Sequence, residues 1–342
     1  FYMKRCIELA KNGLGTTYPN PLVGSVIVHK GKIIGEGWHK KAGEPHAEVN
    51  AVNSVKDKSL LKEATIYVSL EPCSHFGKTP PCCDLIIANE IPNVVVGTVD
   101  PFAKVAGNGI KKLVESGKNV TVGILEDECN ELNKRFFTFH QKQRPYIILK
   151  WAETADGFIA PISKEEKSPV WITNQYSRQL VHKWRTEEQA ILVGTNTVLD
   201  DNPKLDARDF SGNNPVRIVL DKSGKISENY HVKNNSQKTI FITESENFIS
   251  TENCIYENAI FDIHLISSIC DILYKNDIQS VIIEGGSKTL QSFIDANLWD
   301  EARVFKGDTT FQNGILAPNI SGNPVAGFDI MNDELKIFKN YD

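Results

Sequence analysis

Three residues in the first hundred positions carry side chains that zinc prefers, and two of them stand where helices are expected to begin. His46 follows Pro45 and Cys82 follows Pro81, and proline is favoured in the first turn of a helix. Eight residues separate Cys73 from Cys82. A catalytic zinc site uses three protein ligands and leaves the fourth position open. If these three residues bind one ion, their segments must meet at one point, which strongly constrains the fold.

Glu48 stands two residues after His46. Residues i and i+2 do not share a helix face, so Glu48 need not bind the metal and is free to move protons. Zinc-dependent base deaminases carry His-x-Glu followed by Pro-Cys-x-x-Cys, with the glutamate transferring protons. The chain matches the first half, but Phe76 stands where the second cysteine is expected. These residues predict a hydrolytic zinc site with Glu48 as the catalytic residue.

Three other interpretations use the same residues. A purely structural zinc would need a fourth ligand, for which His75 and Cys83 are available, but it leaves Glu48 without a role. A nucleic-acid base deaminase would use the same ligands beside a basic or aromatic surface. A metal-stabilised protein could also hold a nucleotide in its C-terminal half without turnover.

Composition favours an enzyme that acts on small molecules. The chain has 342 residues, of which 41% are hydrophobic and 24% charged, as in globular proteins with two ordinary domains. Its net charge of -5 argues against non-specific binding of nucleic acid. The seven cysteines lack the spacing of a disulfide framework, and no window of about eighteen apolar residues predicts a membrane span. We therefore expect a cytoplasmic protein. Because the chain opens at Phe1, we expect a few preceding native residues to be missing.

Hydrophobic periodicity predicts alternating strands and helices in two domains. The first domain is expected to contain strands at residues 23–28, 33–38, 65–69, 94–97 and 120–122, and helices at 46–55, near 82, at 110–115 and at 126–141. The polar run 141–145 ends in proline and is the best candidate linker. We expect one domain at residues 1–144 and a second at residues 145–342.

The second domain is predicted to form a mostly parallel sheet. Strands are expected at residues 146–150, 190–193, 216–220, 239–242 and 280–283, with helices at 175–184, 264–275 and 288–296. No Gly-x-Gly-x-x-Gly motif opens these units, so the dinucleotide fingerprint of the Rossmann fold is missing. Two strand-glycine-helix turns, at Gly194 and at Gly285-Gly286, could bind an anion at a helix start.

Several motifs together resemble one family. Residues 20–24, 37–39, 42–48 and 72–82 closely resemble the bifunctional deaminase/reductase family of riboflavin biosynthesis, in which the long spacing between the two cysteines is characteristic. The resemblance continues through the second half of the chain. It implies a cytidine-deaminase-like three-layer α/β domain followed by a domain similar to dihydrofolate reductase. It also implies Zn²⁺ and NADPH as cofactors.

The resemblance implies a reaction in two steps. A 2,5-diamino-6-(5-phosphoribosylamino)pyrimidin-4-one would be deaminated, and its ribosyl group would then be reduced to ribityl. In the first domain, His46, Cys73 and Cys82 would bind zinc, and the substrate would contact Asn20, His39 and Lys78.

In the second domain, the family pattern assigns two sets of residues and an assembly. NADPH would contact Trp171, Thr197, Asp201, Gly285 and Gly286. The substrate would contact Lys150, Ser168, Arg185, Leu205, Arg208 and Glu284. Two arginines can hold a phosphate with bidentate hydrogen bonds, and Lys150 and Asp201 are candidates for assisting the opening of the sugar ring. The family also implies a homo-oligomer, a dimer or tetramer, joined through the reductase half.

Three positions depart from the family pattern. Glu153 stands near the expected cofactor where a small or apolar residue is usual, and Asp206 replaces a typical threonine before Arg208. The segment 304–308 replaces a strand that is usually rich in alanine, proline and lysine. The first two departures predict added negative charge beside a phosphate-bearing ligand.

Overall fold

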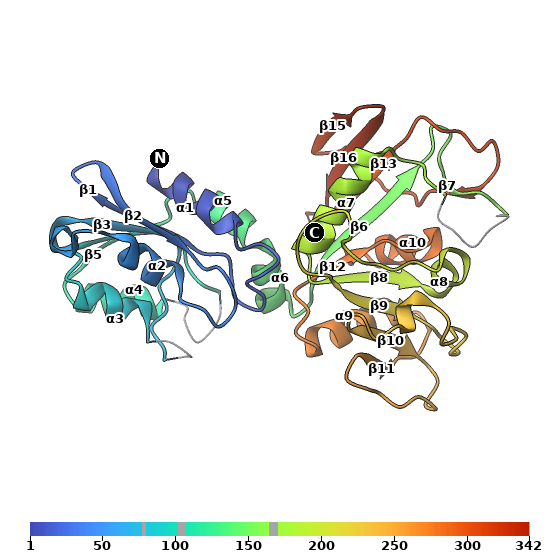
Figure 1. Cartoon of the computed structure of the whole chain (residues 1–342), viewed down its shortest axis with the longest axis horizontal. Helices are drawn as coiled ribbons and strands as arrows, with labels where there is room; N and C mark the ends of the chain where they lie inside the picture. Colours follow the sequence, from blue (N-terminus) through green and yellow to red (C-terminus); the bar gives the residue numbers. More distant parts are fainter. Residues whose placement is uncertain (77–79, 102–106, 164–169, 342) are drawn as a thin grey trace. The chain divides into compact units, whose positions relative to one another are not determined.

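The chain divides into two compact units, each with its own sheet. The computed structural model describes residues 1–76, 80–101, 107–163 and 170–341 (Figure 1). Unit 1 comprises Phe1–Gln143 and unit 2 comprises Arg144–Asp342. The division falls inside the linker that the sequence predicts at residues 141–145.

Unit 1 is built on a mixed five-stranded sheet. Its helices are α1 (Tyr2–Lys11), α2 (Ala47–Ser54), α3 (Cys82–Ala88), α4 (Asn108–Glu115), α5 (Glu126–Leu132) and α6 (Lys134–Lys142), with a 3-10 helix η1 (Lys58–Glu63). Its strands are β1 (Gly24–His29), β2 (Lys32–Trp38), β3 (Thr65–Leu70), β4 (Asn93–Thr98) and β5 (Asn119–Val122). The strand order is β2-β1-β3-β4-β5. β1 runs antiparallel to β2 and β3, whereas β3, β4 and β5 are parallel.

Helices cover both faces of this sheet, because its strands are apolar on both sides. Ile66 and Val68 of β3 pack with α2, α3 and α4. Tyr67 lies on the opposite face, with the apolar side of α1 and with α5. This is the period of two expected of a strand. The result is the three-layer domain that the family resemblance predicts (Figure 1).

The helix predicted over residues 126–141 is wrong in one respect: it is two helices that meet at Asn133. The buried Asn133 side chain accepts a hydrogen bond from the Leu22 amide at 2.8 Å and donates one to the Leu22 carbonyl at 2.9 Å. This pair satisfies both backbone groups of a distant loop and fixes the side chain in place. Helical periodicity gives no sign of that contact, and the sequence analysis also missed α1.

Unit 2 is built on a nine-stranded sheet. Its helices are α7 (Gln175–Glu187), α8 (Thr195–Asp201), α9 (Leu265–Lys275) and α10 (Ser287–Asp295), with a 3-10 helix η2 (His231–Lys233). Its strands are β6 (Tyr146–Glu153), β7 (Phe158–Ala160), β8 (Ala190–Gly194), β9 (Val216–Leu220), β10 (Thr239–Thr243), β11 (Cys254–Asn258), β12 (Ser280–Ile283), β13 (Glu301–Lys306), β14 (Ile315–Leu316), β15 (Ala326–Ile330) and β16 (Asp333–Lys339). The predicted strands and helices of unit 2 agree with these bounds to within three residues.

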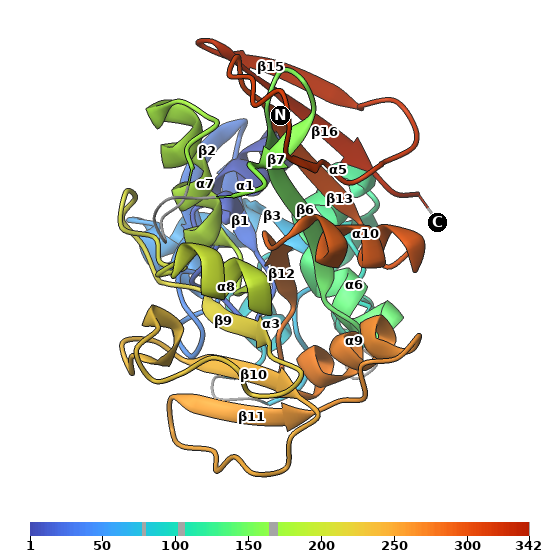
Figure 2. The same ribbon diagram turned by 90° about the vertical axis from the view of Figure 1, so that its right-hand side faces the viewer.

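The sheet of unit 2 is mostly parallel, as predicted. Its order is β11-β10-β9-β8-β12-β6-β13-β16-β15, and only β16 and β15 join it in antiparallel fashion. Side chains from α9 and α10 cover one face. Val198 of α8, and Val181 and Trp184 of α7, cover the other (Figure 2). Residues 304–308, which depart from the family pattern, start in the last part of β13. This strand pairs with β6.

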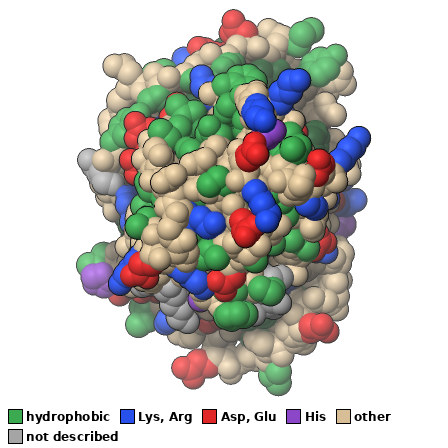
Figure 3. All heavy atoms as spheres, turned by 90° about the vertical axis from the view of Figure 1, so that its left-hand side faces the viewer, with side chains coloured by type: hydrophobic (Ala, Val, Ile, Leu, Met, Phe, Trp, Pro, Cys, Tyr) green, Lys and Arg blue, Asp and Glu red, His purple; other side chains and the backbone are tan. Residues whose placement is uncertain are grey.

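The described residues carry charges of both signs at the surface. On the face shown in Figure 3, basic and acidic side chains are interspersed. Within the described ranges, no helix has the length and apolar character needed to cross a membrane.

We predict that Asn133→Ala lowers the free energy of unfolding by about 2–4 kcal/mol, because both buried backbone groups of Leu22 lose their partner. Chemical denaturation monitored by circular dichroism measures the change. Asn119→Ala removes an exposed asparagine from the same unit and should change the value by less than about 0.5 kcal/mol. Equal effects of the two substitutions would contradict the role assigned to Asn133.

Candidate active sites

His46, Cys73 and Cys82 form a compact ligand group, with their ligand atoms all within 4.8 Å of one another. The Nδ1 atom of His46 lies 3.6 Å from Sγ of Cys73 and 3.4 Å from Sγ of Cys82. Zinc bonds of about 2.0 Å to nitrogen and 2.3 Å to sulfur, arranged tetrahedrally, separate the two atoms by roughly 3.5 Å. The donor set and its spacing therefore fit one zinc ion.

Helix starts deliver two of these ligands. His46 is the N-cap of α2, and Cys82 is the first residue of α3. The amide of Cys82 donates to the sulfur of Cys73 at 3.3 Å. Hydrogen bonding from Cys82, together with that from His46, lowers the pKa of the Cys73 thiol. A thiolate is the form that binds zinc, so this geometry prepares the ligand.

Glu48 lies beside the ligand group on the first turn of α2. Only 3% of the residue is exposed, and this burial raises the pKa of its carboxyl group. It is not a member of the ligand group. A buried carboxyl group next to the metal position can accept and release a proton, as the sequence predicts.

Asn20 and His39 meet each other next to the ligand group. The Nδ2 atom of Asn20 lies 3.0 Å from Nε2 of His39, and the His39 ring is 5.4 Å from the His46 ring. Nδ1 of His39 lies 3.2 Å from the carbonyl of Pro45. Burial lowers the pKa of His39, which favours the neutral imidazole. Lys78, the third predicted substrate contact, lies outside the described residues.

Neither candidate for a fourth protein ligand joins the group. Cys83 is buried and donates its thiol to the Pro72 carbonyl at 3.2 Å and to the Gly109 carbonyl at 3.5 Å. His75 is exposed, and among the described residues only three form the ligand group. Among the described residues the group therefore has three candidate ligands, the number typical of a catalytic zinc site, and not the four of a closed structural site.

The sequence analysis missed Glu71, which holds the loop that carries Cys73. Its buried carboxylate accepts hydrogen bonds from four backbone amides, those of Asp100, Gly107, Gly109 and Ile110, at 2.8 to 3.3 Å. Gly109 is required beside it, because a Cβ atom there would lie 2.1 Å from the Pro72 carbonyl. Glu71 thereby joins the end of β3 to the start of α4. The sequence offered one sign of this contact, namely Gly107 and Gly109 at the start of a predicted helix.

A cavity of about 1270 Å³ opens at the carboxyl ends of the parallel strands of unit 2. This volume exceeds the roughly 300–1,000 Å³ of common ligand pockets, so it has room for two ligands. The predicted residues that line it are Lys150, Trp171, Arg185, Thr197, Asp201, Leu205, Arg208, Glu284 and Gly286. Ser168 lies outside the described residues.

Gly285 differs from the other predicted residues because it does not line the cavity. A Cβ atom at Gly285 would lie 2.6 Å from Cα of Val193. The glycine therefore permits the end of β12 to approach β8 closely. Gly286 follows with a φ of +38° and is the N-cap of α10.

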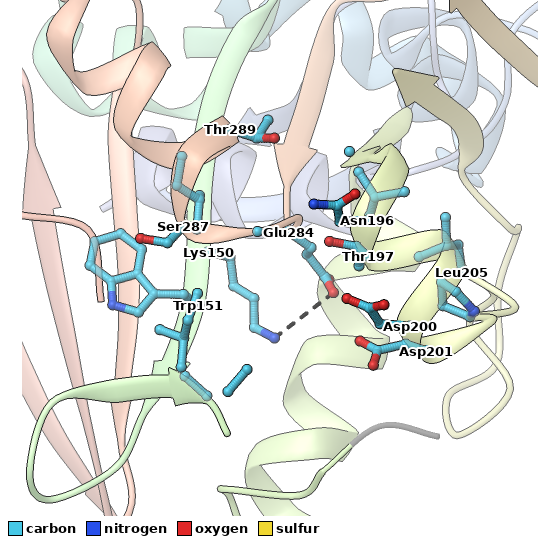
Figure 4. A pocket seen from close by; sticks show the side chains of 18 of the residues that line it. Lys150, Trp151, Asn196, Thr197, Asp200, Asp201, Leu205, Glu284, Ser287 and Thr289 are labelled. Atoms are coloured by element: carbon cyan, nitrogen blue, oxygen red, sulfur yellow. Dashed lines mark ion pairs between the residues drawn. The ribbon is translucent and has the colours of Figure 1, made fainter. Parts of the chain in front are cut away.

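A largely buried cluster of charged side chains lines this cavity. Arg185 holds the Glu284 carboxylate through Nε at 3.1 Å and Nη2 at 2.7 Å. Nζ of Lys150 lies 3.9 Å from the same carboxylate, and the two side chains point toward one another (Figure 4). Burial would raise the pKa of Glu284, but Arg185 and Lys150 lower it to about 2. Burial lowers the pKa of Lys150, and Glu284 opposes that shift.

Glu153 and Asp206, the two acidic residues that depart from the family pattern, both have hydrogen-bond partners. The Glu153 carboxylate accepts a hydrogen bond from the Trp151 indole at 3.0 Å, and Glu153 does not line the cavity. That it adds charge beside a bound ligand stays a prediction. Asp206 pairs with Arg208 at 2.6 Å, and its backbone carbonyl accepts from Arg185 at 3.0 Å. Asp206 thus partly neutralises an arginine that is predicted to bind phosphate.

Family models match parts of both units of the chain. Residues 1–98 match the family model of the cytidine and deoxycytidylate deaminase zinc-binding region, and residues 145–309 match that of the RibD C-terminal domain. The riboflavin biosynthesis protein RibD of Aquifex aeolicus is 41% identical over 99% of this chain and 93% of its own. The RibD protein of Escherichia coli is 35% identical over 96% of this chain and 89% of its own.

A solved structure extends the likeness to the fold. The diaminohydroxyphosphoribosylaminopyrimidine deaminase/5-amino-6-(5-phosphoribosylamino)uracil reductase of Thermotoga maritima superposes with a TM-score of 0.89 at 40% identity, covering 99% of this chain and 97% of that one. Fold and ligand group together define a deaminase with a zinc-binding region, joined to a reductase domain. The chain belongs to the RibD family, the bifunctional deaminases and reductases of riboflavin biosynthesis.

We predict that Glu71→Gln weakens zinc binding about 10- to 100-fold, because an amide group cannot accept from all four backbone donors and the Cys73 loop loosens. Competition with a chromogenic chelator measures the affinity. Glu63→Gln, at an exposed position of the same unit, is the matched control and should leave it unchanged. If Glu71→Gln bound zinc as tightly as wild type, the Glu71 carboxylate would not be the group that positions Cys73.

Proposed function

We propose that this chain deaminates 2,5-diamino-6-(5-phosphoribosylamino)pyrimidin-4-one in unit 1 and then reduces the ribosyl group of the product in unit 2 with NADPH. The observation that carries the proposal is the group of His46, Cys73 and Cys82 with the buried Glu48 beside it. The printed description of the Thermotoga maritima relative, which names both reactions, supports the choice of substrate.

In unit 1, His46, Cys73 and Cys82 would hold zinc. When bound, zinc supplies an activated water for attack on the amine-bearing carbon. The Glu48 carboxylate would take up the proton from that water and deliver it to the departing amine, which leaves as ammonia. Burial raises the pKa of Glu48, which suits a group that must carry a proton between two steps.

Asn20 and His39 would orient the pyrimidine. If Nδ1 of His39 donates to Pro45, its Nε2 atom accepts from Asn20, and the Asn20 carbonyl oxygen remains available to a ring N-H or amine. Lys78 would contact the phosphate.

In unit 2, the NADPH site would lie where α8 and α10 begin. Thr197 and Asp201 lie on α8, and Gly286 caps α10. Helix N-termini favour phosphate groups because their first amides are unpaired. Gly285 would bring the turn close to the cofactor, and Trp171, half exposed at the cavity wall, would cover it.

The substrate would lie against the charge cluster of the same cavity. Arg185 and Arg208 would hold its phosphate, Leu205 and Ser168 would also contact the substrate, and Glu284 and Lys150 would lie at the sugar. When bound, NADPH supplies the hydride. Because burial lowers the pKa of Lys150, its Nζ atom would release a proton more readily than an exposed lysine, which suits a group that transfers a proton during opening of the sugar ring. Asp201 also lines the cavity and is the second candidate for this role.

We predict that Glu48→Gln lowers the rate of ammonia release by at least about 10²-fold, because the amide cannot carry the proton. Metal analysis should still give one zinc per chain, which separates catalysis from metal binding. Glu115→Gln, an exposed glutamate on α4, should behave as wild type. Normal ammonia release from Glu48→Gln would remove the proposed proton carrier.

We predict that Lys150→Met lowers the rate of NADPH oxidation by about 10²-fold or more, since a side chain of similar length then has no proton to transfer. Absorbance of NADPH follows the reaction with the deaminated intermediate as substrate. Ammonia release should stay at the wild-type rate. Lys183→Met, an exposed position on α7, is the control, and equal rates in both variants would refute the role of Lys150.

A further inference from the structure

One face of α7 turns three basic side chains toward the cavity of unit 2. Arg178, His182 and Arg185 all line it, and their spacing of four and three residues places them on one side of a helix. Arg208 lines the same cavity from the loop after α8. The family pattern assigns roles to Arg185 and Arg208, but it gives none to His182.

His182 is buried, and one of its ring nitrogens is unused. The residue is 3% exposed, and its Nε2 atom lies 3.3 Å from the half-exposed carboxylate of Asp209. Its Nδ1 atom is buried without a hydrogen-bond partner among the residues that the structure describes. Buried polar atoms are rarely left in that state. The unused nitrogen therefore points to a bound group that is present during function.

Charges from three elements act on this imidazole. Burial has the largest effect, and with Arg185 on α7 and Arg208 on the neighbouring loop it lowers the pKa of His182 to about 4. Asp209 on the same loop and Glu284 at the end of β12 oppose the shift. Glu284 is already paired with Arg185 and lies near Lys150, while Asp206 is paired with Arg208. In the ligand-free protein His182 is therefore neutral at physiological pH.

We propose that His182 is a third phosphate-binding residue of this cavity, and that it takes up a proton from solvent when the phosphate of the substrate binds between Arg185 and Arg208. Nδ1 gains the proton and donates a hydrogen bond to a phosphate oxygen. Nε2 keeps its proton and its contact with Asp209. This inference rests on the proposed reductase function, because it assumes that these two arginines hold the substrate phosphate.

Binding of a phosphate adds negative charge around the His182 ring. Without ligand, two guanidinium groups oppose protonation of the ring. A phosphate carrying about two negative charges offsets both and offers an acceptor to the buried nitrogen. The pKa of His182 is then higher in the complex than in the free protein, so binding strengthens as pH falls from above the pKa of the complex toward about 4. A ligand hydroxyl that donated to Nδ1 would involve no uptake of a proton.

Titration calorimetry of the full chain with ribose 5-phosphate tests the inference. At pH 7, the dependence of the observed heat on the ionisation enthalpy of the buffer gives the number of protons taken up. Wild type should take up more protons than His182→Gln, by at least about a quarter of a proton per chain at pH 7 if His182 titrates above about pH 6.5 in the complex, and should bind about tenfold more tightly. His264→Gln, which removes an exposed histidine from the same unit, should match wild type.

Nuclear magnetic resonance of the histidine rings gives a second test that does not depend on the folding of a variant. The His182 signals should titrate near pH 4 in free wild-type protein and above about pH 6.5 with ribose 5-phosphate bound. Binding with equal proton uptake in wild type and His182→Gln, or an unchanged His182 titration, would overturn this inference alone. Absence of ribose 5-phosphate binding to wild type and to Arg208→Ala alike would overturn the phosphate site and the inference with it.

Discussion

Parallel strands fix where chemistry can occur in both units, because their carboxyl ends lie at one edge of a sheet and the following helices begin there. In unit 1, β3 leads to Cys73, and α3 begins at Cys82. In unit 2, β8 and β12 lead to the starts of α8 and α10. The first amides of a helix have no partner within the helix, and at the start of α3 the amides of Cys82 and Cys83 donate to the sulfur and the carbonyl oxygen of Cys73. The corresponding edge therefore carries the candidate zinc ligand Cys73 in one unit and the candidate cofactor and substrate cavity in the other.

A glutamate with little exposed surface follows β3 in unit 1 and β12 in unit 2. Different partners neutralise the charges of these two side chains. Glu71 comes directly after β3 and is held by four backbone amides. Glu284 comes directly after β12 and is held by Arg185, with Lys150 nearby. Buried charges are costly unless they are paired. Because its partners are backbone amides, Glu71 is held in one position. The partners of Glu284 are ionisable side chains, so we expect their charges and contacts to change when a ligand binds.

Much of this could be predicted from sequence, because it depends on local patterns. The ligand residues follow proline signals at helix starts, and Glu48 follows from its spacing to His46. The strands of unit 2 follow from short apolar runs. Contacts between distant segments could not be predicted in the same way. Asn133 breaks a periodic helix to bind Leu22, 111 residues away, and Glu71 collects amides 29 to 39 residues away. The hydrogen bond between Glu153 and Trp151 could not be predicted either, because it depends on how the two side chains lie along β6.

We propose two separate chemistries on one chain, of which only the first requires zinc. The direct test removes zinc with a chelator and measures two rates on the same sample, ammonia release from the diaminopyrimidinone ribotide and NADPH oxidation with its deaminated product. We expect ammonia release to disappear and to return when one zinc per chain is restored, while NADPH oxidation stays at its original rate throughout. Ammonia release from zinc-free protein, or loss of NADPH oxidation together with zinc, would contradict the account.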